Sequence, residues 1–166
     1  MLRRACNGTT AAVAEGIHAV QPQSLAVLDD VRPIAFKGMP ADDRLVVPLE
    51  AEGGVPFAIR RVFTVQARRA GLIGGRHAHR VCQQLLVCVH GACEVTCAAT
   101  LEERRVFTLN RPDQGLLIPA SIWAEQRYLT ADTVLMVLCD QHYDAADYIR
   151  DPDDYQAYRR AGSALA

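Results

Sequence analysis

The feature that most constrains the fold is a series of short apolar segments, each bounded by turn-forming residues. These segments are residues 45–49, 59–65, 84–90, 93–98, 105–109, 115–118 and 133–139. Glycine, proline and aspartate separate them, and such residues end strands and form turns. No helical segments alternate with them, and no glycine-rich nucleotide-binding loop is present. The pattern therefore predicts an all-β domain, either a sandwich or a barrel.

The length of the chain, 166 residues, suits one domain. Residues 1–28 are rich in alanine, and we expect a variable N-terminal extension that is irregular or forms a short helix at 11–19. We expect the domain itself to occupy residues 29–158 and a flexible tail to occupy 159–166. The polar and aromatic sequence that follows residue 142 predicts turns and a short helix over the surface of the domain.

Composition excludes several functional classes. The formal net charge is -1, so the basic excess of a nucleic-acid-binding protein is absent. The six cysteines include no CxxC pair, so we expect no zinc site and a reducing compartment. No apolar run has the length of a membrane span, and the basic N-terminus is not followed by an apolar segment. We therefore expect a cytoplasmic protein without a nucleic-acid or membrane partner.

Two segments, 85–89 and 134–138, are apolar at every position. Strands that alternate apolar and polar residues have one buried face, whereas continuously apolar strands are buried on both faces. We expect the second face of these strands to pack against another subunit, which predicts a homodimer.

The strongest candidate for a functional site is the pair His77 and His79. On a strand, residues two apart point to the same face, so both imidazoles project together and Ala78 projects away. Two such histidines can bind a divalent metal as neutral ligands. They can also act as general base and acid, because imidazole titrates near neutral pH.

The sequence around the pair favours acid–base chemistry over metal binding. The metal-binding cupin pattern has His-x-His, then Glu three or four residues later, and a further His after a proline turn. Gln83 and Gln84 occupy the Glu positions here, and Ala124 stands where the third His would be. Because glutamine brings no charge, we expect no metal and no other cofactor.

Further motifs resemble one family of cupin β-barrel proteins, the WxcM-like or FdtA-type sugar-nucleotide 3,4-ketoisomerases. The matching segments, in chain order, are Pro56-Phe57-Ala58-Ile59-Arg60-Arg61-Val62, Arg76-His77-Ala78-His79-Arg80, Gln84-Leu85-Leu86-Val87-Cys88-Val89-His90-Gly91, Ile118-Pro119-Ala120-Ser121-Ile122-Trp123 and Tyr143-Asp144-Ala145-Ala146-Asp147-Tyr148-Ile149-Arg150. Asp43-Arg44 is similar to an Asp-x-Arg-Gly segment near the start of the family. The resemblance implies a cupin or jelly-roll β-barrel with short helical or irregular terminal segments.

The resemblance also implies an activity. Its members move the ketone of a dTDP-4-keto-6-deoxyhexose from C4 to C3 through an enediol, without a metal. It implies a dTDP-linked keto-deoxysugar as ligand and a homodimer. His77 would then be the C3–H base and His79 its partner. The implied substrate-binding residues are Arg44, Arg61, Phe63, Arg76, Gln83, Trp123 and Ala124.

Three positions depart from the family and keep other functions open. Ala124 replaces a residue that is often histidine or another polar group, Phe63-Thr64 replaces a segment that often has tyrosine, and Leu45 replaces the glycine after Asp-x-Arg. These changes allow a non-catalytic cupin that binds a sugar nucleotide. A metal-dependent cupin enzyme is the third alternative.

Overall fold

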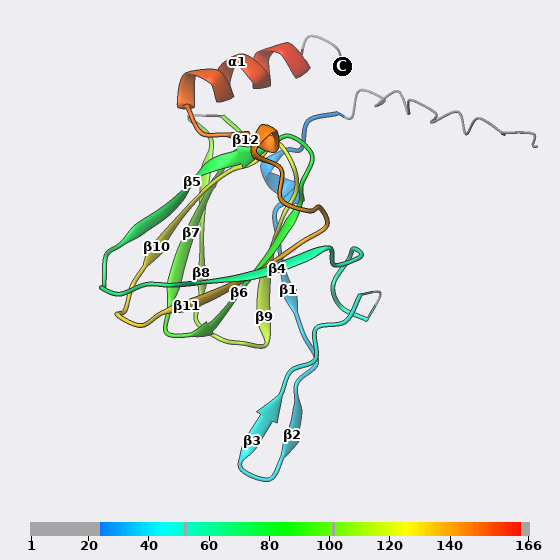
Figure 1. Ribbon diagram of the computed structural model, residues 1–166, viewed down its shortest axis with the longest axis vertical. Helices are drawn as coiled ribbons and strands as arrows, with labels where there is room; N and C mark the ends of the chain where they lie inside the picture. Colours follow the sequence, from blue (N-terminus) through cyan, green and yellow to red (C-terminus); the bar gives the residue numbers. More distant parts are fainter. Residues whose placement is uncertain (1–23, 52, 101, 164–166) are drawn as a thin grey trace, which may run out of the picture.

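The computed structural model describes residues 24–51, 53–100 and 102–163, and two facing antiparallel β-sheets form its centre (Figure 1). The first sheet contains, in spatial order, β1 (Arg32–Ala35), β9 (Gln114–Ile118), β6 (Gln84–His90), β11 (Val134–Cys139) and β4 (Arg61–Gln66). The second contains β12 (Tyr148–Ile149), β5 (Ile73–His79), β10 (Trp123–Tyr128), β7 (Cys93–Ala98) and β8 (Arg104–Leu109). The predicted all-β jelly-roll barrel is confirmed.

The main core lies between the two sheets. Strand β6 shows the alternation that builds it: Leu86 and Cys88 face the interior, whereas Leu85 and Val87 belong to a second cluster on the outer face of the first sheet. That outer cluster is completed by residues from earlier in the same chain, among them Phe36, Val55, Val47, Leu49, Phe57 and Ile59. The central strands β9, β6 and β11 of the first sheet are therefore mostly buried on both faces, as continuously apolar strands predict.

The source of the outer cover differs from the expectation. We expected a second subunit to cover the segments 85–89 and 134–138. Residues of the same chain already cover most of these segments, although Val89 is 40% exposed. A continuously apolar strand indicates that both of its faces are buried, but it does not indicate whether the same chain or another chain covers them. The predicted homodimer loses this support and stays a prediction.

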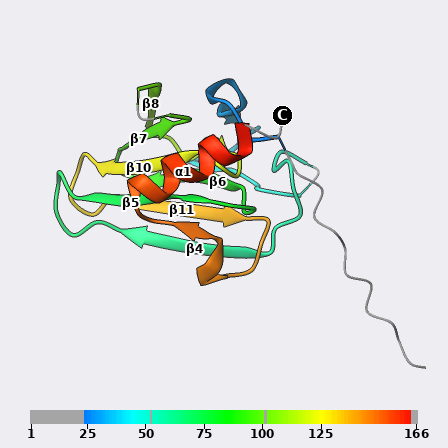
Figure 2. The same ribbon diagram turned by 90° about the horizontal axis from the view of Figure 1, so that it is seen from above.

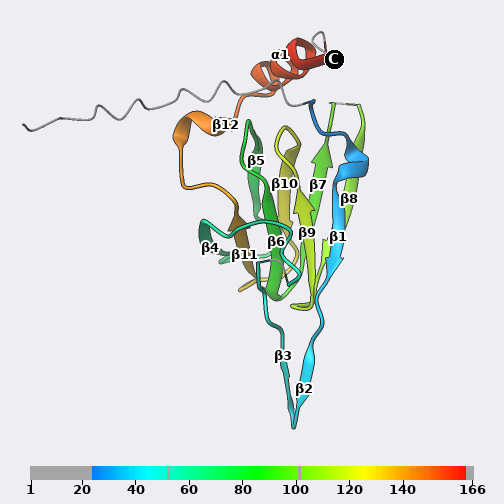
Figure 3. The ribbon, with the colours of Figure 1, turned by 90° about the vertical axis from the view of Figure 1, so that its right-hand side faces the viewer.

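A β-hairpin made of β2 (Met39–Ala41) and β3 (Arg44–Val46) extends away from the barrel (Figures 1 and 3). Its apolar side chains pack little against the rest of the chain. Met39, Leu45 and Val46 are 49%, 50% and 44% exposed. The hairpin therefore presents apolar surface to its surroundings.

The C-terminal segment closes the opposite end of the barrel. It contains the short helix η2 (Ala145–Asp147), strand β12 and helix α1 (Pro152–Ser163), which lies across the ends of the strands (Figure 2). Tyr155 of α1 is fully buried, and its hydroxyl donates a hydrogen bond to the carbonyl oxygen of Ala98 (2.8 Å). This helix anchors the chain that carries β12.

Residues at both predicted domain limits pack against the barrel. Helix α1 continues to Ser163, and Arg159 donates a hydrogen bond to the carbonyl oxygen of Ala26 (2.7 Å), so the predicted tail at 159–166 begins inside a packed helix. At the other end, Leu28 of the short helix η1 (Leu28–Asp30) is buried in the core. The helix expected at 11–19 lies outside the described residues. No helix in the described part of the chain is long and apolar enough to cross a membrane.

Candidate active site

His77 and His79 lie on β5 and share one face, as predicted. Their ring centroids are 4.9 Å apart and the rings are nearly perpendicular. Ala78 points to the other face, where it packs under helix α1 with Ile149 and Tyr155. The histidine pair therefore faces the space between the sheets, beside the edge strands β4 and β12.

A bulge in β5 immediately before His77 sets the position of this histidine. The pairing with β10 passes from Ala124–His77 to Glu125–Gly75, so Arg76 is the extra residue. Both bulge residues have left-handed backbone, with φ of 73° at Gly75 and 57° at Arg76. Glycine adopts this conformation without strain, and a Cβ atom on Gly75 would also overlap the side chain of Gln126. The bulge leaves Arg76 exposed and places His77 opposite Ala124.

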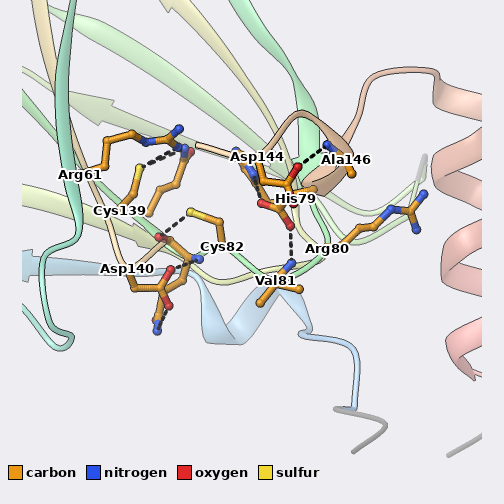
Figure 4. Close-up of polar contacts among 12 residues, drawn as sticks. Arg61, His79, Arg80, Val81, Cys82, Cys139, Asp140, Asp144 and Ala146 are labelled. Atoms are coloured by element: carbon orange, nitrogen blue, oxygen red, sulfur yellow. Dashed lines mark hydrogen bonds and ion pairs between the residues drawn. The ribbon is translucent and has the colours of Figure 1, made fainter. Parts of the chain in front are cut away.

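His79 forms a dyad with Asp147. Its Nδ1 lies 2.6 Å from Asp147 Oδ2, and the two side chains are only 6% and 11% exposed. The other carboxylate oxygen, Oδ1, accepts a hydrogen bond from the backbone N–H of Val81 at 2.7 Å (Figure 4). The carboxylate is thus fixed on both sides and holds the imidazole in one orientation. The buried Nε2 of His79 has no hydrogen-bond partner among the described residues.

Burial lowers the pKa of both histidines below the ordinary value of 6.5. For His79 the hydrogen bond to Asp147 opposes this effect without reversing it, and the neighbouring His77 adds to the lowering. For His77 a hydrogen bond to the backbone of Gly75 opposes burial, and the charge of Arg150 adds to it. Burial thus favours the neutral form of both imidazoles, which is the form able to accept a proton.

Tyr148 covers the histidine pair from β12. Its ring centroid lies 4.3 Å from that of His79 and 5.0 Å from that of His77, and the guanidinium of Arg150 lies 4.2 Å from its ring centroid. Tyr148 lies over the histidines because β12 pairs with β5 and places Tyr148 opposite His79.

Asp147 and Tyr148 were not among the site residues predicted from the sequence. They belong to the segment 143–150 that carries the most specific family resemblance, and that was the available signal. Nothing local in the sequence shows that this segment forms an edge strand beside His79, 68 residues away from Asp147.

Arg61 and Phe63 enter the same region from β4. The Arg61 guanidinium donates a hydrogen bond to Cys139 Sγ (3.4 Å) and lies 5.4 Å and 5.5 Å from the ring centroids of Phe63 and Tyr143 (Figure 4). Arg61 interacts with Tyr148, which covers the histidines, and its charge acts on His79. The structure therefore brings together His77, His79, Arg61, Phe63 and Ala124.

Three other predicted site residues lie elsewhere. Trp123 points to the outer face of its sheet, is 9% exposed and packs against Tyr155 under α1, so it is a core aromatic. Gln83 donates hydrogen bonds to Asp140 from its backbone N–H and its side chain, both at 3.0 Å. Arg44 lies on the exposed β2–β3 hairpin, with a side chain that is 72% exposed, at the opposite end of the barrel from β12 (Figure 1).

Trp123 and Ala124 lie on different faces because adjacent residues on a strand point to opposite sides of the sheet. Ala124 faces the interior, so Trp123 cannot. The same phase turns Gln84 inward, with its Nε2 3.7 Å from Cys139 Sγ, while Gln83 lies outside the strand. At the two positions where metal-binding cupins have ligands, the interior therefore holds an uncharged amide and a methyl group.

Comparison with known proteins places this site in a family. Residues 29–160 match the family model described as "FdtA: WxcM-like, C-terminal". A TDP-4-oxo-6-deoxy-alpha-D-glucose-3,4-oxoisomerase of Aneurinibacillus thermoaerophilus is 33% identical over 128 residues, covering 75% of this chain and 89% of that protein.

Solved structures show the same relationship. A sugar 3,4-ketoisomerase from Thermoanaerobacterium thermosaccharolyticum, in complex with TDP, has a TM-score of 0.76 and 30% identity, over 81% of this chain and 98% of that one. A 3,4-ketoisomerase from Helicobacter canadensis has a TM-score of 0.75 and 27% identity, over 79% of this chain and 98% of that one. The family resemblance inferred from the sequence motifs is thus confirmed, and the chain belongs to the WxcM-like, FdtA-type family.

Proposed function

We propose that the protein is an isomerase that moves the ketone of a TDP-linked 4-keto-6-deoxyhexose from C4 to C3. The observation that carries the proposal is the buried His79–Asp147 dyad beside His77, in a chain of this family. The reaction has no net redox change. A base removes the proton on C3, and the electron pair forms an enediolate across C3 and C4. The proton of the C3 hydroxyl passes to the C4 oxygen, and a proton returns to C4 as the C3 ketone forms.

The geometry favours His79 as the group that takes the C3 proton. Asp147 accepts a hydrogen bond from the Nδ1–H group of His79, which leaves the lone pair of Nε2 free to accept a proton. The carboxylate also stabilises the imidazolium that results. We had predicted His77 as the base and His79 as its partner. The dyad supports the reverse assignment, with His77 returning the proton or holding the sugar.

Arg61 is the side chain best placed to stabilise negative charge in this region. Its guanidinium projects from β4 toward the histidine side of the barrel, and its Nε is buried without a hydrogen-bond partner among the described residues. A guanidinium presents several donors in a fixed plane, which suits an enediolate or a diphosphate. We assign it to one of these oxyanions.

The ligand is a TDP-linked keto-deoxysugar. Support comes from two structures of the T. thermosaccharolyticum ketoisomerase: one is a complex with TDP, and the other is a variant in complex with TDP-4-keto-6-deoxyglucose. We also propose a homodimer, supported by the apolar surface that the β2–β3 hairpin exposes. Arg44 lies far from the histidines of its own chain, so a role for Arg44 at a site requires a second subunit. Sedimentation velocity tests the dimer.

The reaction is tested with metal-stripped protein and dTDP-4-keto-6-deoxyglucose in deuterated water. NMR should show the 3-keto isomer and deuterium on the sugar ring, and His79→Ala should abolish both. Absence of exchange and product would contradict the proposal. Binding of the sugar nucleotide measured by calorimetry, without turnover, would instead favour a non-catalytic cupin. The structural argument for that alternative is that Ala124, which has no polar group, lies opposite His77.

A further inference from the structure

The thiol of Cys82 lies close to both members of the His79–Asp147 dyad, so three different metal-ligating side chains meet there. One ligand atom from each of His79, Cys82 and Asp147 lies within 4.8 Å of the others. His79 and Cys82 are buried, at 5% and 2% exposure, and the Asp147 side chain is 11% exposed. Cys82 follows β5 by three residues, whereas Asp147 comes from η2, so the fold and not a sequence motif assembles the cluster.

The donor set suits zinc. An imidazole nitrogen, a thiolate and a carboxylate are ligands that Zn²⁺ accepts together, whereas Mg²⁺ and Ca²⁺ prefer oxygen alone. With bonds of about 2.0–2.3 Å, ligand atoms around tetrahedral zinc lie about 3.3–3.6 Å apart. The three observed atoms lie within 4.8 Å of one another, and His79 Nδ1 and Asp147 Oδ2 are 2.6 Å apart, so binding the ion requires these two atoms to separate by about 1 Å.

The ring nitrogen of His79 that faces the cluster is Nδ1, because Asp147 Oδ2 lies 2.6 Å from it. The other nitrogen, Nε2, is buried without a hydrogen-bond partner among the described residues and is left for the substrate.

We propose that Zn²⁺ binds at His79, Cys82 and Asp147 and inhibits the enzyme. The inhibition, though not the binding, rests on the proposed isomerase function. Binding releases the Cys82 thiol proton to solvent as the thiolate–zinc bond forms. Because Asp147 Oδ2 lies 2.6 Å from Nδ1, zinc shared by these residues binds Nδ1 in place of its proton, and the neutral ring then carries its proton on Nε2. The free basic nitrogen is thereby lost.

This site differs from the metal site of cupin enzymes and from a zinc motif. It does not use His77 or the positions of Gln84 and Ala124. The absence of a CxxC pair led us to expect no zinc site, and that argument covers only sites with closely spaced cysteine ligands. The cluster here uses one thiol and two side chains brought to it by the fold.

Co²⁺ is the probe, because it occupies zinc sites and its bonds to thiolate absorb in the near ultraviolet. Reduced, metal-free protein is titrated with Co²⁺ without substrate. We expect a thiolate-to-cobalt band that Zn²⁺ abolishes by competition. Cys82→Ser should lose this band, whereas Cys88→Ser, a change of another buried core thiol, should keep it. No band in the wild type, or an undiminished band in Cys82→Ser, would overturn the site.

Inhibition is measured separately. Zn²⁺ should suppress isomerisation by the wild-type protein, a chelator should restore it, and Cys82→Ser should need at least about tenfold more Zn²⁺ while its activity without metal is unchanged. Equal zinc sensitivity of Cys82→Ser and wild type would overturn the proposed inhibition. A cobalt band in a protein without isomerase activity would overturn the proposed function and leave the metal site standing.

Discussion

Replacing Asp147 with asparagine changes the chemistry of the dyad while it changes the shape of the site very little. The amide oxygen of the introduced side chain can still accept the hydrogen bond that Val81 N–H now gives to Oδ1. The amide nitrogen then faces His79 Nδ1, where Oδ2 now lies at 2.6 Å. Because an amide nitrogen donates, Nδ1 must accept, and the single proton of the neutral ring moves to Nε2. The lone pair needed at Nε2 is lost.

The size of the effect follows from this change of tautomer. The equivalent substitution in Ser-His-Asp triads lowers kcat by about 10⁴ for the same reason. A second imidazole, His77, lies beside His79 and limits the loss. We expect kcat to fall by about 10²–10⁴, equivalent to about 3–5 kcal/mol in the activation free energy. KM should change little, because no contact to the nucleotide is altered.

The assay measures both product formation and deuterium incorporation from solvent with dTDP-4-keto-6-deoxyglucose. Asp144→Asn is the matched control, because Asp144 is an exposed residue whose Oδ1 only caps η2 by accepting from the backbone N–H of Ala146 (2.9 Å). An asparagine oxygen can replace it there, and activity should stay near the wild-type value. If Asp147→Asn folds normally and keeps kcat within about threefold of wild type, the dyad does not orient the base and the reasoning fails.

Three other changes test different parts of the site. With a chelator present, the free energy of unfolding should fall as the pH drops below about 6.5. Burial lowers the pKa values of His77 and His79 in the folded protein, so the unfolded chain binds more protons in this range. A urea midpoint that stays constant between pH 7 and 5 would contradict the burial of the two histidines. Gly75→Ala should cost about 2–4 kcal/mol in urea unfolding, since φ is 73° and the new Cβ overlaps Gln126, and a loss under 0.5 kcal/mol would mean that the bulge rearranges freely. Trp123→Phe should lower the melting temperature and leave KM unchanged, and a rise in KM without loss of stability would return Trp123 to the sugar pocket.

The sequence predicted the parts of the fold that depend on local pattern. Alternation and turn residues identified the strands, and the two-residue period placed His77 and His79 on one face. The sequence did not distinguish between neighbouring residues where the phase of the strand was not known. It placed both Trp123 and Ala124 in the pocket, although adjacent strand residues cannot share a face, and it preferred Gln83 to the inward-facing Gln84. Register is set by pairing partners distant in the chain, which a single sequence does not reveal.

The residues missed altogether, Asp147 and Tyr148, depend on packing that no local pattern records. Strand β12 is two residues long, and ladder hydrogen bonds alone do not hold so short a strand. Its second residue, Ile149, is 2% exposed in the cluster under α1, which also buries Tyr155 completely. One face of this strand therefore belongs to the core beneath α1 and the other to the histidine pair. Docking of the C-terminal helix and assembly of the His79–Asp147 dyad are consequently one event, and a change that loosens α1 should lower activity before it unfolds the barrel.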